Sequence, residues 1–195
     1  MRSRAVRVQT IFLVSVALSA CGNAGAPSGS AAKAAESAAV GTPITLANAD
    51  FEQSADDGSI PGWMMLQHAG VPAYEMKIEA DAAYHGKGGF RMTRTHEQIY
   101  GTLAQDIELP TPLSGEVELT GMVKSKDVGP EGWKLMLIAA DVPEYSQSLV
   151  GTNDWRRVSV RAKLKPNTRS LRIGATLIDA GTGWVDDIQL RAIAQ

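Results

Sequence analysis

The chain has 195 residues, with 19 Lys and Arg against 21 Asp and Glu, which gives a formal net charge of −2. Removing Arg2, Arg4 and Arg7, which belong to a predicted export signal, leaves 16 basic residues against 21 acidic ones, a net charge of −5. A mildly acidic surface of mixed charge argues against nucleic acid and anionic lipid as electrostatic partners, because both need clustered basic residues. The single cysteine, Cys21, rules out an internal disulfide.

Residues 1–20 have the pattern of a secretory signal peptide. Arginines precede an apolar run, Ile11–Leu18, which is too short to cross a bilayer, where about 20 residues are needed. A Leu-Ser-Ala-Cys motif follows and ends at Cys21, and it resembles the lipobox of bacterial lipoproteins. The resemblance implies cleavage before Cys21 and lipidation of its sulfur and amine, so that several acyl chains anchor the protein in a membrane. The alternative is an ordinary signal peptide that happens to precede a cysteine.

The segment after the cysteine predicts where the protein is held. Lipoproteins of this type with an aspartate after the cysteine stay in the inner membrane, and here Gly22 stands there, so the resemblance implies the outer membrane of the cell envelope. Residues 21–42 are rich in Ala, Gly and Ser without apolar periodicity, which predicts a flexible linker. The remaining residues, 43–195, are enough for one domain with a single core.

Short strands are predicted throughout this domain. Glu116–Lys124 has the clearest alternation of apolar and polar residues, and similar segments recur between Gly, Pro and Asp residues, without a persuasive helical pattern. The expected strands are residues 44–46, 48–52, 63–66, 74–78, 89–94, 103–109, 116–124, 133–139, 157–164, 170–177 and 183–190. The predicted fold class is therefore all-β, an antiparallel sandwich or barrel.

Two of the expected strands carry a carboxylate in an unusual position. Asp186 alternates with Ile188 and Leu190, which predicts that it faces the core, where it must be hydrogen-bonded or bind a cation. Residues 48–52 carry Glu52 in a second apolar and acidic segment. Acid-bearing strands near both ends of the domain predict that these ends lie together.

A series of short motifs resembles the galactose-binding-domain-like jelly rolls, a fold that many carbohydrate-binding modules share. In chain order the motifs are Asn48-x-x-Phe51-Glu52, Pro61-Gly62-Trp63, His85-Gly86-Lys87, Gln105-Asp106-Ile107, Gly151-Thr152-Asn153-Asp154-Trp155 and Trp184-Val185-Asp186-Asp187-Ile188. The part from Tyr100 to Leu190 is especially similar to accessory domains of secreted bacterial hydrolases. The resemblance implies an antiparallel jelly-roll β-sandwich and is specific for the fold rather than for a ligand.

Related jelly rolls often hold a structural calcium ion, which takes six to eight oxygen ligands. The resemblance implies such an ion between the carboxylates of Glu52 and Asp186, completed by the backbone carbonyls of Asp50 and Lys87. The loop 82–87 lacks the acidic residue that some calcium-binding relatives supply there. The alternative is an ion pair between Lys87 and one of these acids, with backbone amides satisfying the remaining oxygens.

Sugar binding requires exposed aromatic rings beside polar groups. The tryptophans in framework motifs are expected to pack in the core or line an edge; they are Trp63, Trp155 and Trp184. We therefore expect a ligand site around Trp133 and Tyr145, with Tyr100 and Gln147. The alternative is that these are ordinary half-buried loop aromatics.

The motifs of catalysis are missing. The chain has no Gly-x-Ser-x-Gly nucleophile elbow, and its three histidines lie in separate segments without the spacing of zinc ligands. The sequence therefore predicts no enzyme, but a lipid-anchored binding or accessory module of the cell envelope that binds glycan through loop and concave-face aromatics. The alternative is a protein-interaction or structural lipoprotein of an envelope complex that binds no carbohydrate.

Overall fold

The computed structural model describes residues 41–139 and 142–193, and nearly all of their regular structure is β-strand. The predictions for Cys21 and for most of the linker lie outside these residues. One short 3-10 helix spans Ala80–Ala82. The strands are β1 Gly41–Ile44, β2 Met64–Gln67, β3 Tyr74–Glu79, β4 Gly89–Arg94, β5 Gly101–Ile138, β6 Pro143–Tyr145, β7 Leu149–Leu177 and β8 Thr182–Ile193.

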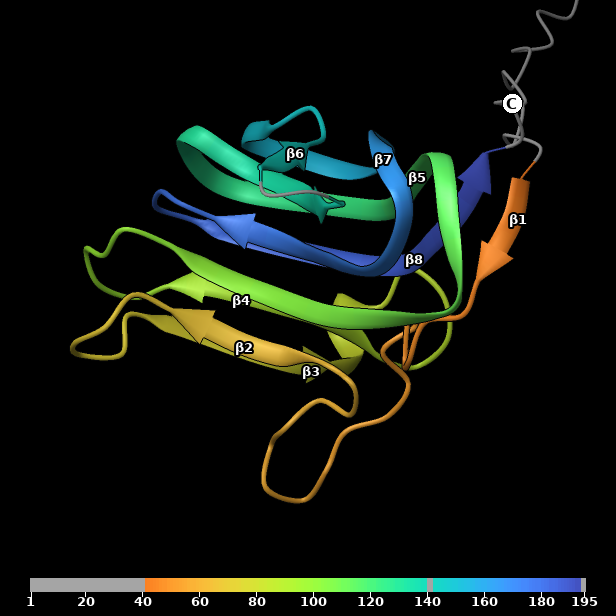
Figure 1. Cartoon of the computed structure of the whole chain (residues 1–195). Helices are drawn as coiled ribbons and strands as arrows, with labels where there is room; N and C mark the ends of the chain where they lie inside the picture. The colour runs from red at the N-terminus through yellow and green to blue at the C-terminus, as the bar shows by residue number, and fades with distance from the viewer. Residues whose placement is uncertain (1–40, 140–141, 194–195) are drawn as a thin grey trace, which may run out of the picture. The chain divides into compact units, whose positions relative to one another are not determined.

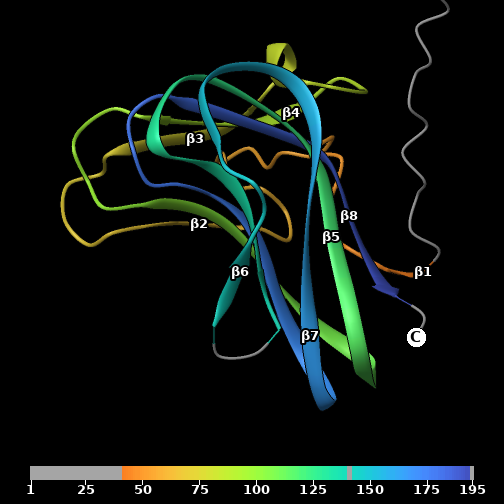
Figure 2. The same ribbon diagram turned by 90° about the horizontal axis from the view of Figure 1, so that it is seen from above.

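The strands form an antiparallel sandwich in which β5 and β7 bend and run through both sheets (Figures 1 and 2). The first sheet has the order β2, β5 (101–109), β7 (170–177), β5 (133–138) and β6. The second sheet has the order β3, β4, β8, β5 (116–126) and β7 (153–164), and β1 pairs with the end of β8. The predicted jelly-roll sandwich is confirmed.

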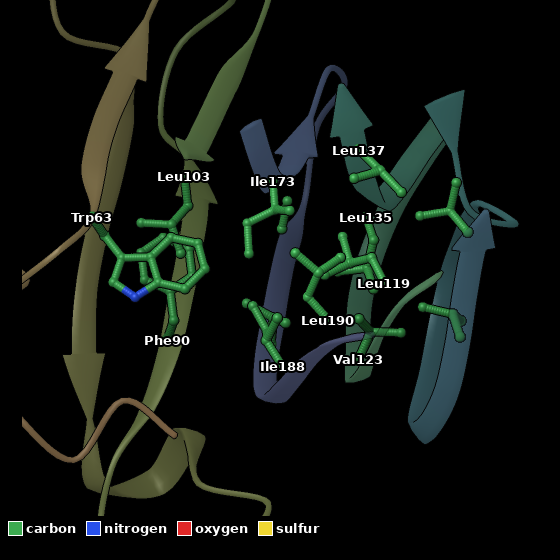
Figure 3. Close-up of a cluster of buried hydrophobic side chains, with 14 of the residues drawn as sticks. Trp63, Phe90, Leu103, Leu119, Val123, Leu135, Leu137, Ile173, Ile188 and Leu190 are labelled. Atoms are coloured by element: carbon green, nitrogen blue, oxygen red, sulfur yellow. The ribbon is translucent and has the colours of Figure 1, made fainter. Parts of the chain in front are cut away.

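The core lies between the two sheets and is filled by alternate residues of the strands. Leu103 and Ile173 from the first sheet and Leu119 and Leu190 from the second are fully buried, and Figure 3 shows the side chains of both sheets directed toward one another. The period of two follows from the pleat, which sends successive side chains to opposite faces. In the part of the chain that the structure describes, no helix is long and apolar enough to cross a membrane.

The two ends of the domain meet, as predicted, although through different residues. Gly41–Ile44 pairs with residues 190–193 of β8, and the amide of Ile188 donates to the carbonyl of Ala49 at 3.0 Å. Residues 48–52 are a turn rather than the predicted strand, because Asn48 and Phe51 both have positive φ, of 44° and 51°. The first strand starts at Gly41, two residues before the predicted domain boundary.

A β-bulge in β8 overturns the predicted orientation of Asp186. Thr120 pairs with Gln189, but Met122 pairs with Asp186, so β8 has one residue more than β5 at this point, and Asp187 has a φ of 49°. Such an extra residue reverses the alternation along the strand. Val185 and Ile188 therefore face the core, whereas Asp186 faces away from it and is buried beneath a loop instead.

Candidate functional site

The outer face of the first sheet has a floor of small side chains. Alternation directs Thr102, Ala104, Gly174 and Thr176 away from the core, and the register places Ala104 beside Gly174 and Thr102 beside Thr176. The two threonine hydroxyls are 2.9 Å apart. All four residues are buried, so neighbouring side chains cover them. We call this outer face, together with the cavity of about 600 Å³ at its Asp106–Arg172 end, the sheet groove.

Larger side chains border the floor on both sides. On β2, Met64 and Leu66 oppose Ala104 and Thr102. On the other side Met136 lies next to Gly174, since these two residues pair in the register. Met64 and Leu66, rather than the small buried residues beside them, are therefore the accessible apolar side chains of this part of the face.

A cavity of about 600 Å³ lies at one end of this face, where Asp106 and Arg172 are the next outer positions of β5 and β7. Its walls include Glu108, Ile138 and Ser170 and residues 165–169 of β7. Arg172 Nε and Nη2 donate to the two carboxylate oxygens of Asp106, at 2.5 and 2.8 Å, and these bonds lower the pKa of Asp106. The cavity thus presents charged and hydroxyl groups, whereas the rest of the sheet groove is mainly apolar.

Three of the four predicted ligand residues lie on this face or at its edge. Tyr145, on the edge strand β6, is 43% exposed, and its ring lies 5.0 Å from Lys134 Nζ. Gln147 is exposed two residues further on. Tyr100 is 38% exposed at the start of β5 and packs edge-to-face on His68, with ring centroids 6.2 Å apart. Three strand spacings, about 14 Å, separate the strand of Tyr100 from β6.

Trp133, the fourth predicted ligand residue, is fully buried, so the prediction that it contacts a ligand is wrong. Its indole nitrogen donates to the carbonyl of Trp184 at 2.9 Å, and its ring packs over Gly183. The sequence contains the signal for this placement, because Trp133 alternates with the core residues Leu135 and Leu137.

The carboxylate of Asp186 is held by backbone amides. Oδ2 accepts N–H bonds from Tyr84 at 2.7 Å and His85 at 3.0 Å, and Oδ1 accepts one from Asp187 at 2.7 Å. Burial raises the pKa of Asp186, and the three N–H bonds oppose that rise. This aspartate fastens the loop before β4 to the bulge in β8.

The carboxylate of Glu52 is also held by backbone amides. Its Oε1 accepts N–H bonds from Lys87 at 2.7 Å and Gly88 at 3.0 Å, and both bonds lower its pKa. The backbone amide of Lys87 is the partner, rather than the side-chain ammonium that the sequence suggested. Asp50 is exposed on the neighbouring turn.

These residues, as placed, do not fit a calcium ion. Calcium needs six to eight oxygens, whereas N–H donors face three of the four carboxylate oxygens of Glu52 and Asp186. Residues 41–139 and 142–193 contain no group of three His, Cys, Asp or Glu side chains that could hold a metal. Of the alternative, the backbone amides are present, whereas Lys87 forms no ion pair with either acid within the described residues.

Comparison with solved structures gives the fold a context. No family model and no curated protein matches the chain. A family 61 carbohydrate-binding module in complex with β-1,4-galactotriose matches with a TM-score of 0.52 and 20% identity, over 75% of this chain and 97% of that one. The CBM22-1 xylan-binding domain of Paenibacillus barcinonensis Xyn10C matches with a TM-score of 0.53 and 16% identity, over 81% and 99%.

A third match is a family 16 carbohydrate-binding module, with a TM-score of 0.52 and 18% identity, over 74% of this chain and all of the other. At such identities the likeness shows the fold alone. The domain has the jelly-roll fold of carbohydrate-binding modules.

Proposed function

We propose that this protein is a non-catalytic carbohydrate-binding module that holds a glycan chain in the sheet groove. The observation that carries the proposal is the polar cavity of about 600 Å³ on the outer face of the first sheet, which also carries the exposed ring of Tyr145. Sites of this size with few convergent polar groups are typical of small ligands. The similarity in fold to modules described with galactotriose and xylan supports the same class of ligand.

The two parts of the groove suit the two sides of a sugar. The Tyr145 ring is exposed and can stack on the apolar face of a pyranose, while Lys134 beside it can donate to hydroxyl groups. At the cavity, Asp106, Arg172 and Ser170 offer acceptors and donors to the hydroxyls of the next sugar units. Such partners are needed because a polar ligand loses its water when it binds.

Titration calorimetry of the protein with soluble xylan and β-1,4-galactan tests this function. We expect binding to at least one of them, with a Kd about tenfold weaker in Tyr145→Ala, a loss of about 1.4 kcal/mol. Tyr84→Ala, on the opposite sheet, is the matched control and should bind as the unmodified protein does. Failure of the protein to bind any glycan of a broad panel would contradict the proposal.

We further propose that the module works at the outer membrane of the cell envelope, anchored there through a lipidated Cys21. The signal peptide and the lipobox-like motif support this location. Growth with radiolabelled palmitate followed by membrane fractionation tests the anchor. Cys21→Ala should carry no label and leave the membrane fraction, and a labelled or still membrane-bound variant would refute the anchor.

A protein-interaction role is the second candidate, and one observation favours it. Val71 and Ile99 are 75% and 60% exposed on two loops that join beside β2, where His68 N–H donates to the Tyr100 carbonyl. Exposed apolar groups of this kind often mark contact sites between proteins. Cross-linking in cells should then capture an envelope protein that Val71→Asp with Ile99→Asp no longer captures, whereas glycan binding would persist.

A further inference from the structure

Two tryptophans flank a lysine on the outer face of the second sheet. Trp184 of β8 pairs with Lys124 of β5, whose Nζ lies 5.4 Å from the Trp184 ring. On the other side of β5, Val123 pairs with Arg156 and Ser125 with Asn153, so Trp155 of β7 lies beside Lys124. The two tryptophans are thus two strand spacings apart, about 10 Å.

Neither tryptophan belongs to the core, and a third aromatic ring lies beside Trp155. Trp155 and Trp184 are both partly exposed and lie outside the cluster of core side chains. Tyr84, which is 38% exposed, packs against Trp155 with ring centroids 5.6 Å apart. Tyr84 is held in place because its amide is one of those bound to Asp186. We call Trp155, Trp184, Tyr84 and Lys124 the aromatic row.

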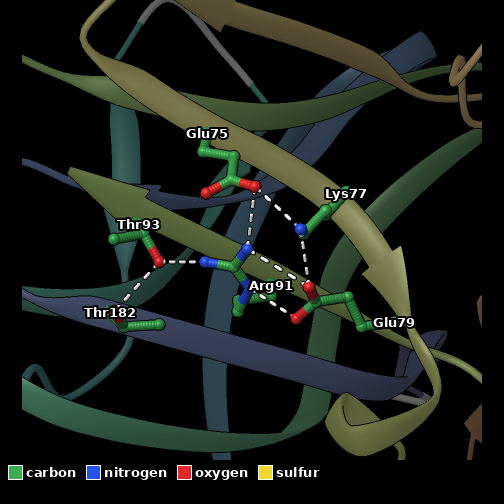
Figure 4. A network of polar contacts seen from close by, with 6 residues as sticks. All are labelled: Glu75, Lys77, Glu79, Arg91, Thr93 and Thr182. Atoms are coloured by element: carbon green, nitrogen blue, oxygen red, sulfur yellow. Dashed lines mark hydrogen bonds and ion pairs between the residues drawn. The ribbon is translucent and has the colours of Figure 1, made fainter. Parts of the chain in front are cut away.

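Three cations lie in the strands that carry the aromatic row. Lys124, Lys126 and Arg157 form no ion pair with a carboxylate of the described residues. Some other cations of the same face are paired: Lys77 and Arg91 bind Glu75 and Glu79, as Figure 4 shows, and Arg161 binds Glu118. Lys124, Lys126 and Arg157 can instead receive an anion.

Three acids lie in the segments around the row. Asp154 accepts the amide of Trp155, Asp187 accepts from His85 Nδ1 at 2.5 Å, and Asp127 accepts from the Thr152 hydroxyl. These acids keep their charge, but within the described residues none of them forms an ion pair with Lys124, Lys126 or Arg157.

We propose that the aromatic row is a second binding surface, which takes an anionic polysaccharide such as a polyuronate. Pyranose rings stack on Trp155 and Trp184, and the carboxylates of the polymer meet Lys124, Lys126 and Arg157. A neutral glycan would leave these cations unused. A nucleic acid is disfavoured because the chain carries a net negative charge. The surface lies on the opposite sheet from the sheet groove, so the two proposals stand independently.

The test is titration of the full chain with polygalacturonate, with xylan and polyglutamate as comparison polymers. We expect polygalacturonate to bind and its Kd to weaken at least tenfold in Trp184→Ala and in Lys124→Gln, and also when the salt concentration is raised. Lys124→Gln removes the charge from a partly exposed position on the outer face of the sheet without opening the core, so its loss of binding would not reflect misfolding. Tyr145→Ala in the sheet groove should bind polygalacturonate normally.

Three results would overturn the proposal that the aromatic row is a second binding surface. They are an absence of polygalacturonate binding, equal binding of polyglutamate, or polygalacturonate binding that Lys124→Gln leaves unchanged. A loss in Tyr145→Ala alone would assign the polymer to the sheet groove and would also count against the aromatic row. Glycan binding in the sheet groove is tested separately: it would be contradicted if the unmodified protein bound neither xylan nor galactan.

Discussion

Trp133 and Gly183 belong to two strands that touch through the core, and there is no space between them. A Cβ built on Gly183 would lie 2.3 Å from the Trp133 ring, closer than carbon atoms can approach. The ring cannot withdraw, because it is fully buried and its nitrogen is bonded to the Trp184 carbonyl. This pair therefore limits how closely the 133–138 part of β5 can approach β8 across the core.

We predict that Gly183→Ala lowers the free energy of unfolding by about 1 to 3 kcal/mol through overpacking. Trp133→Ala should cost more, about 3 to 5 kcal/mol, because it leaves a large cavity. Urea denaturation measures both, with Tyr145→Ala as an exposed control that should change little. A Trp133→Ala variant as stable as the parent would mean that this ring is not in the core.

Single residues also show where sequence patterns succeed. The alternation of Val158, Val160 and Ala162 predicts their burial, and the loop positions of Tyr100 and Tyr145 predict their exposure. The orientation of Asp186 could not be foreseen, because the bulge depends on how β8 registers with β5, which no local pattern records. Residues 48–52 form a turn instead of the predicted strand for a similar reason, since the positive φ of Phe51 is imposed by the tertiary structure.

At the scale of elements, the loop between β3 and β4 is fastened to both ends of the domain by backbone amides. Asp186 of β8 binds the amides of Tyr84 and His85, and Glu52 near the start of the domain binds those of Lys87 and Gly88. The loop therefore needs no metal to keep its position.

We predict that the unfolding temperature is the same in EDTA and in millimolar calcium. A calcium ion bound only by the folded state would raise that temperature, and the residues here do not fit such an ion. Asp186→Asn should lower the free energy of unfolding by about 1 to 3 kcal/mol, since an amide oxygen replaces only part of the carboxylate's acceptors. A calcium-dependent rise that Asp186→Asn abolishes would restore the calcium site that the family resemblance implies.

The outer face of β3 and β4 holds an ion-pair network centred on Arg91. Arg91 is bonded to Glu79 at 2.5 Å and to Glu75 at 3.1 Å, and Lys77 bridges the same two acids (Figure 4). Hydrogen bonds from Lys77 and Arg91 lower the pKa of Glu75, and those from Arg91 and Lys77 lower the pKa of Glu79. The folded state thus favours the charged form of both acids.

Because both pKa values are lowered by folding, their contribution to stability is present above the unfolded pKa of about 4.3 and is lost as the pH falls through the folded values. We predict that Arg91→Gln costs about 1 to 2 kcal/mol at pH 7 and that this difference from the parent shrinks toward zero near pH 3. Urea denaturation at several pH values measures it. A difference that stays constant with pH would mean that Arg91 acts by packing alone.

At the scale of the whole molecule, the fold could be predicted from the sequence more completely than the site. Strand alternation and the order of the framework motifs indicate a jelly roll, and the solved carbohydrate-binding modules share it. The sheet groove is not visible in any segment, because Ala104 and Gly174 become neighbours only when β5 and β7 bend through both sheets. Its floor therefore consists of residues that a local pattern treats as ordinary strand positions.

The most direct measurement of the central claim is an NMR titration of the isotope-labelled protein with xylohexaose and β-1,4-galactotriose. We predict that the backbone signals of Asp106, Tyr145, Ser170 and Arg172 shift with at least one of these sugars, while the indole signals of Trp155 and Trp184 stay in place. Shifts confined to the second sheet, or none with any sugar tested, would contradict glycan binding in the sheet groove.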